Sequence, residues 1–202
     1  MNTRTATLVI ACGALAREIA ALRRANSWSA LDVRCLPAEL HNRPERIAPA
    51  VRDAIRESRP RYAQIFVAYG DCGTRGELDA VLKEEGVERL AGAHCYEFLA
   101  TAPVFAQLAD AEPGTFYLTD FLLKNFERLV VKPLGLDRHP ELKCEYFRHY
   151  RKLVYLAQAP RPGAIEAAQR IARSFGFEFG YCFTGYGELG SRLAALLARP
   201  AA

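Results

Sequence analysis

The stretch QIFVAYGDCGTRGELDAVL, residues 64–82, holds a complete strand–turn–helix unit. Its first half is an apolar run, typical of a strand that is covered on both faces. Its second half has the apolar spacing of an amphipathic helix. Between them, Gly70-Asp71-Cys72-Gly73 puts a cysteine on a tight turn, after a carboxylate and between glycines. We predict that this turn lies at the carboxyl end of a parallel strand, where open α/β sheets bind their ligands.

The same alternation of short apolar runs and amphipathic segments continues through the chain. Residues 7–13 and 152–158 are further predicted strands, and residues 163–176 are a further predicted helix. Such alternation indicates an α/β fold with a doubly wound, mainly parallel, Rossmann-like sheet and helices on both faces. A length of 202 residues suits one domain or one compact two-lobed unit, and we predict a single domain over residues 1–202. We expect a helical insert near residues 136–151.

Composition and segment lengths argue against several classes of protein. Half of the residues are hydrophobic and 25% are charged, as in ordinary soluble domains. The net charge is +4 with no dense basic run, so nucleic-acid binding is not expected. The apolar start, residues 5–16, is short and runs into a charged helical segment, which argues against a signal peptide. No segment is long and apolar enough for a membrane span. We therefore expect a cytoplasmic location, with the oligomeric state left open.

Six cysteines stand in the chain, and no two of them form a C-x-x-C motif. They are Cys12, Cys35, Cys72, Cys95, Cys144 and Cys182. In a cytoplasmic protein they are expected to be reduced thiols or metal ligands rather than disulfides. A free cysteine usually packs as a small buried hydrophobe. That is our interpretation of Cys35, Cys144 and Cys182.

Cys12, Cys72 and Cys95 differ because each stands at or just after the end of a predicted strand, and at or next to a predicted helix start. For Cys95, the predicted strand is residues 87–92 and the predicted helix is residues 96–109. The free N–H groups of a helix start lower the pKa of a thiol, and thiolate is the form that binds metal. Together with His41 or His94, these cysteines would form a site for a borderline-soft metal, with zinc as first choice. Three cysteines with one open position would also suit an iron–sulfur cluster. Structural packing is the alternative for all three.

Polar residues and glycines surround these cysteines. Asp71 is a candidate catalytic base or a residue that orients a ligand, and a helix N-cap is the alternative. The candidate substrate-binding residues are Arg43, Arg75, Gly70, Gly73 and Tyr96. The two arginines could hold an anionic group, or could simply be solvated at the surface. The glycines allow unusual backbone dihedrals and close approach of the backbone.

A metal-free nucleophile is a further alternative for Cys72. His41 or His94 would then act as its base. A phosphatase loop needs arginine six residues after its cysteine, and that position holds Leu78, so this class of enzyme is excluded. The glycine spacing meets neither the dinucleotide fingerprint nor the Walker motif. A nucleotide cofactor therefore has no direct support.

Five segments together resemble the domain-of-unknown-function 1638 family of bacteria and archaea. These segments are ACGALA (11–16), ELHNRPE (39–45), YGDCG (69–73), HCYEFL (94–99) and GYGELG (185–190). Members of that family are often encoded near corrinoid-dependent methyltransferases of methylated amines. The resemblance thus implies a role in one-carbon metabolism, with a small molecule or a corrinoid protein as partner, and it implies no particular reaction.

Two functions of different kinds follow from these observations. The first is a metal-binding protein whose zinc ion activates a thiol or a water molecule, and whose enzyme class would be a metal-dependent transferase. The second is an accessory protein that binds or loads a corrinoid without catalysis. Metal content and colour of the purified protein distinguish them.

Overall fold

A computed structural model describes residues 7–198 of the chain, which form two compact units. The first unit contains residues 7–98 and 188–198, and the second contains residues 99–187. Each unit has a parallel sheet with helices packed on it, so the predicted α/β class is confirmed. Within residues 7–198 there is no helix with both the length and the apolar character that crossing a membrane requires.

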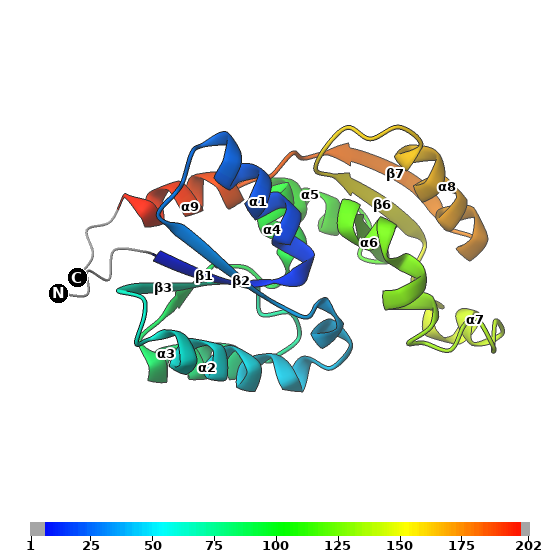
Figure 1. The fold of residues 1–202 in the computed structure, drawn as a ribbon. Coiled ribbons are helices and arrows are strands. Elements are labelled where there is room, and N and C mark those ends of the chain that lie inside the picture. The colour runs from blue at the N-terminus through cyan, green and yellow to red at the C-terminus, as the bar shows by residue number, and fades with distance from the viewer. Residues whose placement is uncertain (1–6, 199–202) are drawn as a thin grey trace. The chain divides into compact units, whose positions relative to one another are not determined.

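The first unit is built on a four-stranded sheet with the order β2-β1-β3-β4, in which all neighbours run parallel (Figure 1). Its strands are β1 (Thr7–Cys12), β2 (Leu31–Leu36), β3 (Gln64–Ala68) and β4 (Glu88–Arg89). The chain runs from β1 to β2 on one side and then returns to β3 on the other side of β1. The gap between β1 and β3 is therefore a topological switch point, the usual place for a ligand in such sheets.

Helices cover both faces of this sheet, with α1 and α9 on one face and α2 and α3 on the other (Figure 1). The helices are α1 (Ala16–Ala25), α2 (Ile47–Ser58), α3 (Glu77–Glu85), α4 (Cys95–Ala100) and α9 (Leu189–Leu197). Three short 3-10 helices are η1 (Gly13–Leu15), η2 (Ala38–Asn42) and η3 (Pro44–Arg46). The connection from β1 to β2, through α1, and the connection from β2 to β3, through α2, cross the sheet in opposite directions. Right-handed crossovers therefore put α1 and α2 on opposite faces.

The core of the first unit lies on the two faces of its central strands. All six residues of β1 are buried, as expected for a strand with helices on both sides. Helix α2 turns Ile47, Val51 and Ile55 to the sheet, and all three are fully buried. Their spacing of four residues places them on one helix face.

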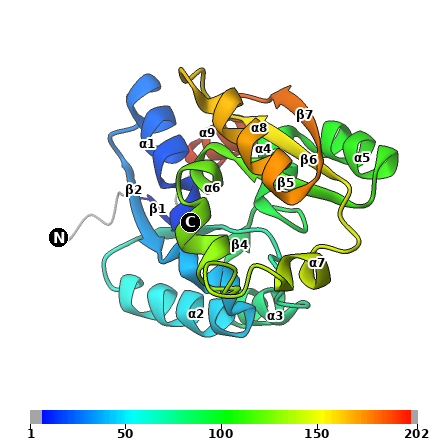
Figure 2. The ribbon, with the colours of Figure 1, turned by 90° about the vertical axis from the view of Figure 1, so that its right-hand side faces the viewer.

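The second unit has a three-stranded parallel sheet with the order β5-β6-β7. Its strands are β5 (Thr115–Thr119), β6 (Lys152–Ala157) and β7 (Glu178–Phe183). Its helices are α5 (Ala102–Ala111), α6 (Asp120–Lys124), α7 (Leu142–Tyr146) and α8 (Ala164–Phe175), with a π-helical turn at Glu127–Val131. Helices α6 and α8 pack against each other and against the strands (Figure 2).

Side chains on β5 alternate between the two faces of this second sheet. Phe116 packs edge-on against Phe126, on the face that α6 and α8 cover. Tyr117 points to the other face, where its ring lies 5.0 Å from that of Phe105 in α5. The alternation is the period of two that a strand imposes.

Several predictions about the fold need correction. The predicted helix 96–109 is two helices, α4 and α5, because Thr101 takes a positive φ of 70° between them and Pro103 stands in the first turn of α5, a position that favours a helix start. The strands form two sheets instead of one. The segment 136–151 contains α7, and the rest of it is mostly turns. A single domain over residues 1–202 stays a prediction.

Two cysteines lie elsewhere than predicted. Cys35 and Cys144 are exposed, so they do not pack as buried hydrophobes. Cys35 belongs to β2, and β2 is an edge strand whose outer side has no neighbouring strand. Cys182, on the edge strand β7, is half-buried.

Candidate metal centre

Residues from four loops of the first unit gather at the carboxyl end of its sheet. Cys12 is the last residue of β1, and Cys72 stands in the loop after β3. His41 comes from η2, which follows β2, and Cys95 is the first residue of α4. The switch point thus brings together residues that are up to 83 positions apart in the sequence, between Cys12 and Cys95.

The imidazole of His41 lies between two buried sulfur atoms. Its Nδ1 is 3.7 Å from Sγ of Cys12, and its Nε2 is 3.9 Å from Sγ of Cys95. Sγ of Cys12 also accepts a hydrogen bond of 3.4 Å from the backbone N–H of Ala14. Cys12 and Cys95 therefore face opposite ring nitrogens of one histidine.

Three of the predicted ligands form a compact group. One ligand atom each from His41, Cys72 and Cys95 lies within 4.8 Å of the other two. The two cysteines are 5% and 6% exposed, so the group is shielded from water but remains close to the surface. Donor atoms around a tetrahedral zinc ion are about 3.5–3.8 Å apart, given bonds of about 2.0–2.3 Å. A small contraction of the group would meet that geometry.

Two glycines allow the loops to approach this closely. A Cβ atom on Gly70 would lie 2.9 Å from the backbone of His94, and one on Gly13 would lie 2.8 Å from the carbonyl oxygen of Leu36. Backbone hydrogen bonds of 3.0 and 2.8 Å join the N–H groups of Asp71 and Cys72 to the loop after β4. The sequence pattern Gly-Asp-Cys thus fixes one side of the group through its backbone.

Cys72 itself has an unusual backbone conformation. Its φ is 51°, in the left-handed region that only glycine adopts without strain. It lies five residues before α3 begins at Glu77, so the predicted helix start does not act on this thiol. Cys12 does match the prediction as the N-cap of η1, and Cys95 matches it as the first residue of α4.

Interactions within the group favour a negative charge on Cys72 and a positive charge on His41. A hydrogen bond from Cys95, together with His41 and His94, lowers the pKa of Cys72 well below that of a free thiol, against the effect of burial. The same contact with Cys72, and burial, raise the pKa of Cys95. Burial alone would lower the pKa of His41, but its hydrogen bonds to Cys12 and Cys72 outweigh burial and raise this pKa to about 10. Without metal, the group is a thiolate–imidazolium pair beside a neutral thiol.

The carboxylate of Asp71 is engaged within its own loop. It accepts hydrogen bonds from Oγ1 of Thr74 at 2.7 Å, from N–H of Gly76 at 3.0 Å and from N–H of Arg75 at 3.3 Å. Burial raises the pKa of Asp71, but these hydrogen bonds together outweigh burial and lower the pKa below its ordinary value, so the carboxyl group is ionised. The arrangement is that of a capping residue, and a catalytic role of Asp71 stays a prediction.

The other predicted site residues surround the group less closely. His94 is exposed, and its ring lies 5.4 Å from that of Tyr96. A hydrogen bond with its imidazole contributes to the lowered pKa of Cys72. Arg43, just after η2, and Arg75, in the Cys72 loop, both have exposed side chains. Their roles as ligands or substrate contacts stay predictions.

Tyr69 is a residue of this region that sequence reasoning missed. Its side chain is fully buried directly after β3, and its hydroxyl lacks a hydrogen bond of normal geometry within residues 7–198. Burial and the nearby sulfurs of Cys12, Cys72 and Cys95 raise its pKa, so it is a neutral phenol. An aromatic residue at the end of a buried strand normally indicates core packing, and the only signal here was its position before Gly70.

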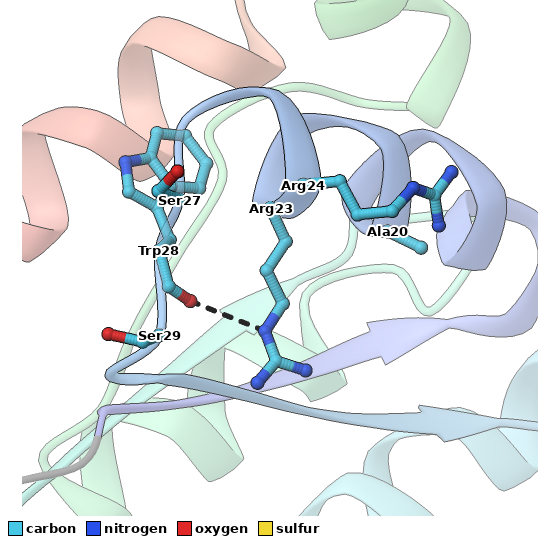
Figure 3. A pocket seen from close by; sticks show the side chains of 6 residues that line it. All are labelled: Ala20, Arg23, Arg24, Ser27, Trp28 and Ser29. Atoms are coloured by element: carbon cyan, nitrogen blue, oxygen red, sulfur yellow. Dashed lines mark hydrogen bonds between the residues drawn. The ribbon is translucent and has the colours of Figure 1, made fainter.

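Two cavities among the described residues lie apart from the proposed metal ligands. One of about 380 Å³ lies where α1 ends and the chain enters β2, near the amino end of the sheet (Figure 3). It is lined by Ala20, Arg23, Arg24, Ser27, Trp28 and Ser29. Nε of Arg23 donates to the carbonyl oxygen of Trp28 there. A second, of about 360 Å³, belongs to the second unit and includes Tyr155, Arg161 and Tyr181 in its lining.

Comparisons with known proteins identify the family of this chain but assign it no reaction. Neither the comparison with curated proteins nor that with solved structures gives a match. The profile of one family, described as "Protein of unknown function (DUF1638)", matches residues 35–193, which is more than half of the chain. This match confirms the resemblance seen in the sequence: the chain belongs to the DUF1638 family.

Proposed function

We propose that this protein binds one transition-metal ion, zinc as first choice, through Nε2 of His41 and the thiolates of Cys72 and Cys95. The observation that carries the proposal is the convergence of these three donor atoms within 4.8 Å at the topological switch point. Two thiolates and an imidazole suit zinc in both softness and charge. Three protein ligands leave a fourth position open, as in catalytic rather than structural zinc sites.

In this proposal Cys12 does not bind the ion. Its sulfur faces Nδ1 of His41, on the side of the ring away from Cys95. A metal-bound histidine usually donates its other N–H to an acceptor, which fixes the tautomer and the ring orientation. Cys12 supplies that acceptor, and Ala14 N–H holds its sulfur in place. Of the predicted ligands, this proposal keeps Cys72, Cys95 and His41, and it gives Cys12 the role of orienting the histidine.

The open position gives the site its chemistry. A zinc ion there would bind and activate a water molecule or a thiol as a nucleophile. Activation of a thiol for methyl transfer would agree with the corrinoid-linked metabolism that the family resemblance implies, and would make the protein a transferase. Its partners would be a small molecule or a corrinoid protein. Reduced thiols are required throughout, which supports a cytoplasmic location.

Metal analysis of the purified full-length protein tests this function. We expect about one zinc ion per chain in the wild type, and loss of the ion in Cys72→Ser. Cys35→Ser is the matched control, because Cys35 is exposed on the edge strand β2. A brown protein that absorbs near 400 nm would indicate an iron–sulfur cluster. Protein without zinc or iron that takes up added cobalamin would support the accessory role.

A cysteine nucleophile is the second candidate, and one observation favours it. The Cys72 thiol is stabilised as thiolate by both His41 and His94. Low-pKa thiolates next to histidine are typical of nucleophilic cysteines. Metal-free protein with one thiol that reacts rapidly at pH 6 would support this candidate over the metal site.

A further inference from the structure

The buried hydroxyl of Tyr69 points to a ligand that would complete the metal centre. Tyr69 has no exposed surface. Its hydroxyl interacts with the sulfur of Cys12 but makes no hydrogen bond of normal geometry with residues 7–198. Buried tyrosine hydroxyls usually have a partner, so a buried one without a partner calls for an explanation. A partner that is not part of the chain would provide it.

Tyr69 is located beside the proposed ligands. The parallel register pairs Ala11 of β1 with Ala68 of β3, so the next residues along the two strands, Cys12 and Tyr69, are neighbours. The same loop reaches Cys72 three residues later. The sulfur of Cys95 also contributes to the raised pKa of the Tyr69 phenol. The hydroxyl is thus within the electrostatic reach of every thiol in the cluster.

The charge of the centre determines what the hydroxyl would hold. A divalent ion with two thiolates and a neutral imidazole has no net charge, so an anion in the fourth position makes the complex negative. A thiolate has no hydrogen to donate, so the ionised sulfurs of the centre can accept hydrogen bonds but cannot donate them. Tyr69 is a neutral phenol and supplies a donor at this place, which favours an anionic over a neutral occupant.

We propose that Tyr69 is a positioning residue whose hydroxyl donates a hydrogen bond to a small anionic ligand in the open coordination position. The inference rests on the proposed function, because it needs the ion on His41, Cys72 and Cys95. It narrows the substrate class to molecules that bind the metal through a deprotonated oxygen, nitrogen or sulfur atom. The alternative is that the hydroxyl only packs against the sulfur of Cys12.

Cobalt-substituted protein provides the test, with azide as the probe anion. Azide binding to cobalt(II) changes its visible absorption bands, so a titration gives the dissociation constant. We expect Tyr69→Phe to bind one cobalt ion as the wild type does, and to bind azide at least about tenfold more weakly, the factor for a lost hydrogen bond to a charged acceptor. Tyr62→Phe is the control, since the Tyr62 hydroxyl donates to Asp32 instead, and it should leave azide affinity unchanged.

The outcomes separate the inference from the function beneath it. Wild-type protein that binds no cobalt would overturn both. Wild-type protein that binds cobalt but not azide, or equal azide affinity in Tyr69→Phe and wild type, would overturn the inference and leave the metal site standing. Loss of cobalt or of folding in Tyr69→Phe would also overturn it, because the hydroxyl would then serve the fold or the ion itself. Thermal melting of the metal-free variant shows which of these applies.

Discussion

Sγ of Cys12 lies 3.7 Å from Nδ1 of His41, and the opposite nitrogen of the same ring faces Cys95. This relationship divides three apparently equivalent strand-end cysteines into two kinds. In the proposed site, Cys95 lies on the side of the imidazole that binds the ion, and Cys12 lies on the opposite side and orients the ring. The division leads directly to different expectations for the two residues.

Replacing Cys12 should weaken metal binding without changing the ligands. Loss of a hydrogen-bond partner behind a metal-bound histidine typically costs about 10–100-fold in affinity. We expect Cys12→Ala to show that loss and Cys12→Ser to recover part of it, because a serine oxygen can accept the Nδ1–H. X-ray absorption at the zinc edge should find two sulfur ligands in the wild type and in both variants. A drop from three sulfurs to two in Cys12→Ala would show that Cys12 binds the ion.

Cys72 should show conflicting demands of function and stability. Its φ of 51° suits glycine, and any residue with a Cβ atom is strained there by about 1 kcal/mol or more. Both Cys72→Gly and Cys72→Ala remove the thiol and should lose the metal. In chemical denaturation of the metal-free proteins, we expect the glycine variant to be more stable than the alanine variant by about 1 kcal/mol. An alanine variant of equal or greater stability would mean that this backbone conformation is not strained.

Metal binding should release protons from the group. The pKa of His41 is raised to about 10 and that of Cys95 is raised too, so at pH 7 both carry a proton that the ion must displace. Cys72 is already a thiolate and contributes none. We expect about two protons per ion, measured by titration calorimetry in buffers of different ionisation enthalpy. Release of no proton would contradict the charge pattern.

The raised pKa of His41 also predicts how the metal-free protein responds to pH. Since the folded-state value of about 10 exceeds the ordinary 6.5, the protonated imidazole stabilises the fold fully below pH 6.5. That contribution should be lost as the pH rises from 6.5 through about 10. Denaturation midpoints of wild type and His41→Gln should therefore differ most at low pH and converge at high pH.

Asp71 should prove important for stability and not for the ion. Its carboxylate accepts three hydrogen bonds inside the loop, an arrangement comparable to a helix cap. We expect Asp71→Ala to lower the free energy of unfolding by about 0.5–2 kcal/mol, the range for lost caps, with metal stoichiometry unchanged. Asp79→Ala is a control in the same region, since Asp79 is an exposed partner of Arg89. Loss of metal in a folded Asp71→Ala protein would favour the predicted ligand-orienting role.

Local sequence patterns predicted many of the strands and the position of the candidate site residues at the strand ends. Apolar runs predicted β1, β3 and β6 within a few residues, because a strand covered on both faces must be apolar throughout. The division into two sheets was not predictable, since nothing in a strand's own sequence states which strand it will pair with. The general rule for strand ends, by contrast, located the candidate residues correctly at one edge of the first sheet.

The division of roles within the site depended on three-dimensional detail. The sequence presents Cys12 and Cys95 as similar strand-end thiols, and only the orientation of His41 between them distinguishes the two. The preference for His41 over His94 likewise depended on η2, which brings the His41 ring between the sulfurs of Cys12 and Cys95. Tyr69 was missed because a buried hydroxyl without a partner cannot be seen in a sequence.

Gly70 offers a test of how closely the loops must approach. An added Cβ atom there would lie 2.9 Å from the backbone of His94, and a backbone cannot move aside as a flexible side chain can. We therefore expect Gly70→Ala to separate the Cys72 loop from the start of α4 and to weaken zinc binding by more than tenfold, measured by competition with a chromogenic chelator. Gly190→Ala is the matched control in the same unit: its Cβ would meet only the tip of Leu22, and its helix should gain stability. If the two variants bound zinc equally well, the short distance between Gly70 and His94 would have no part in forming the site.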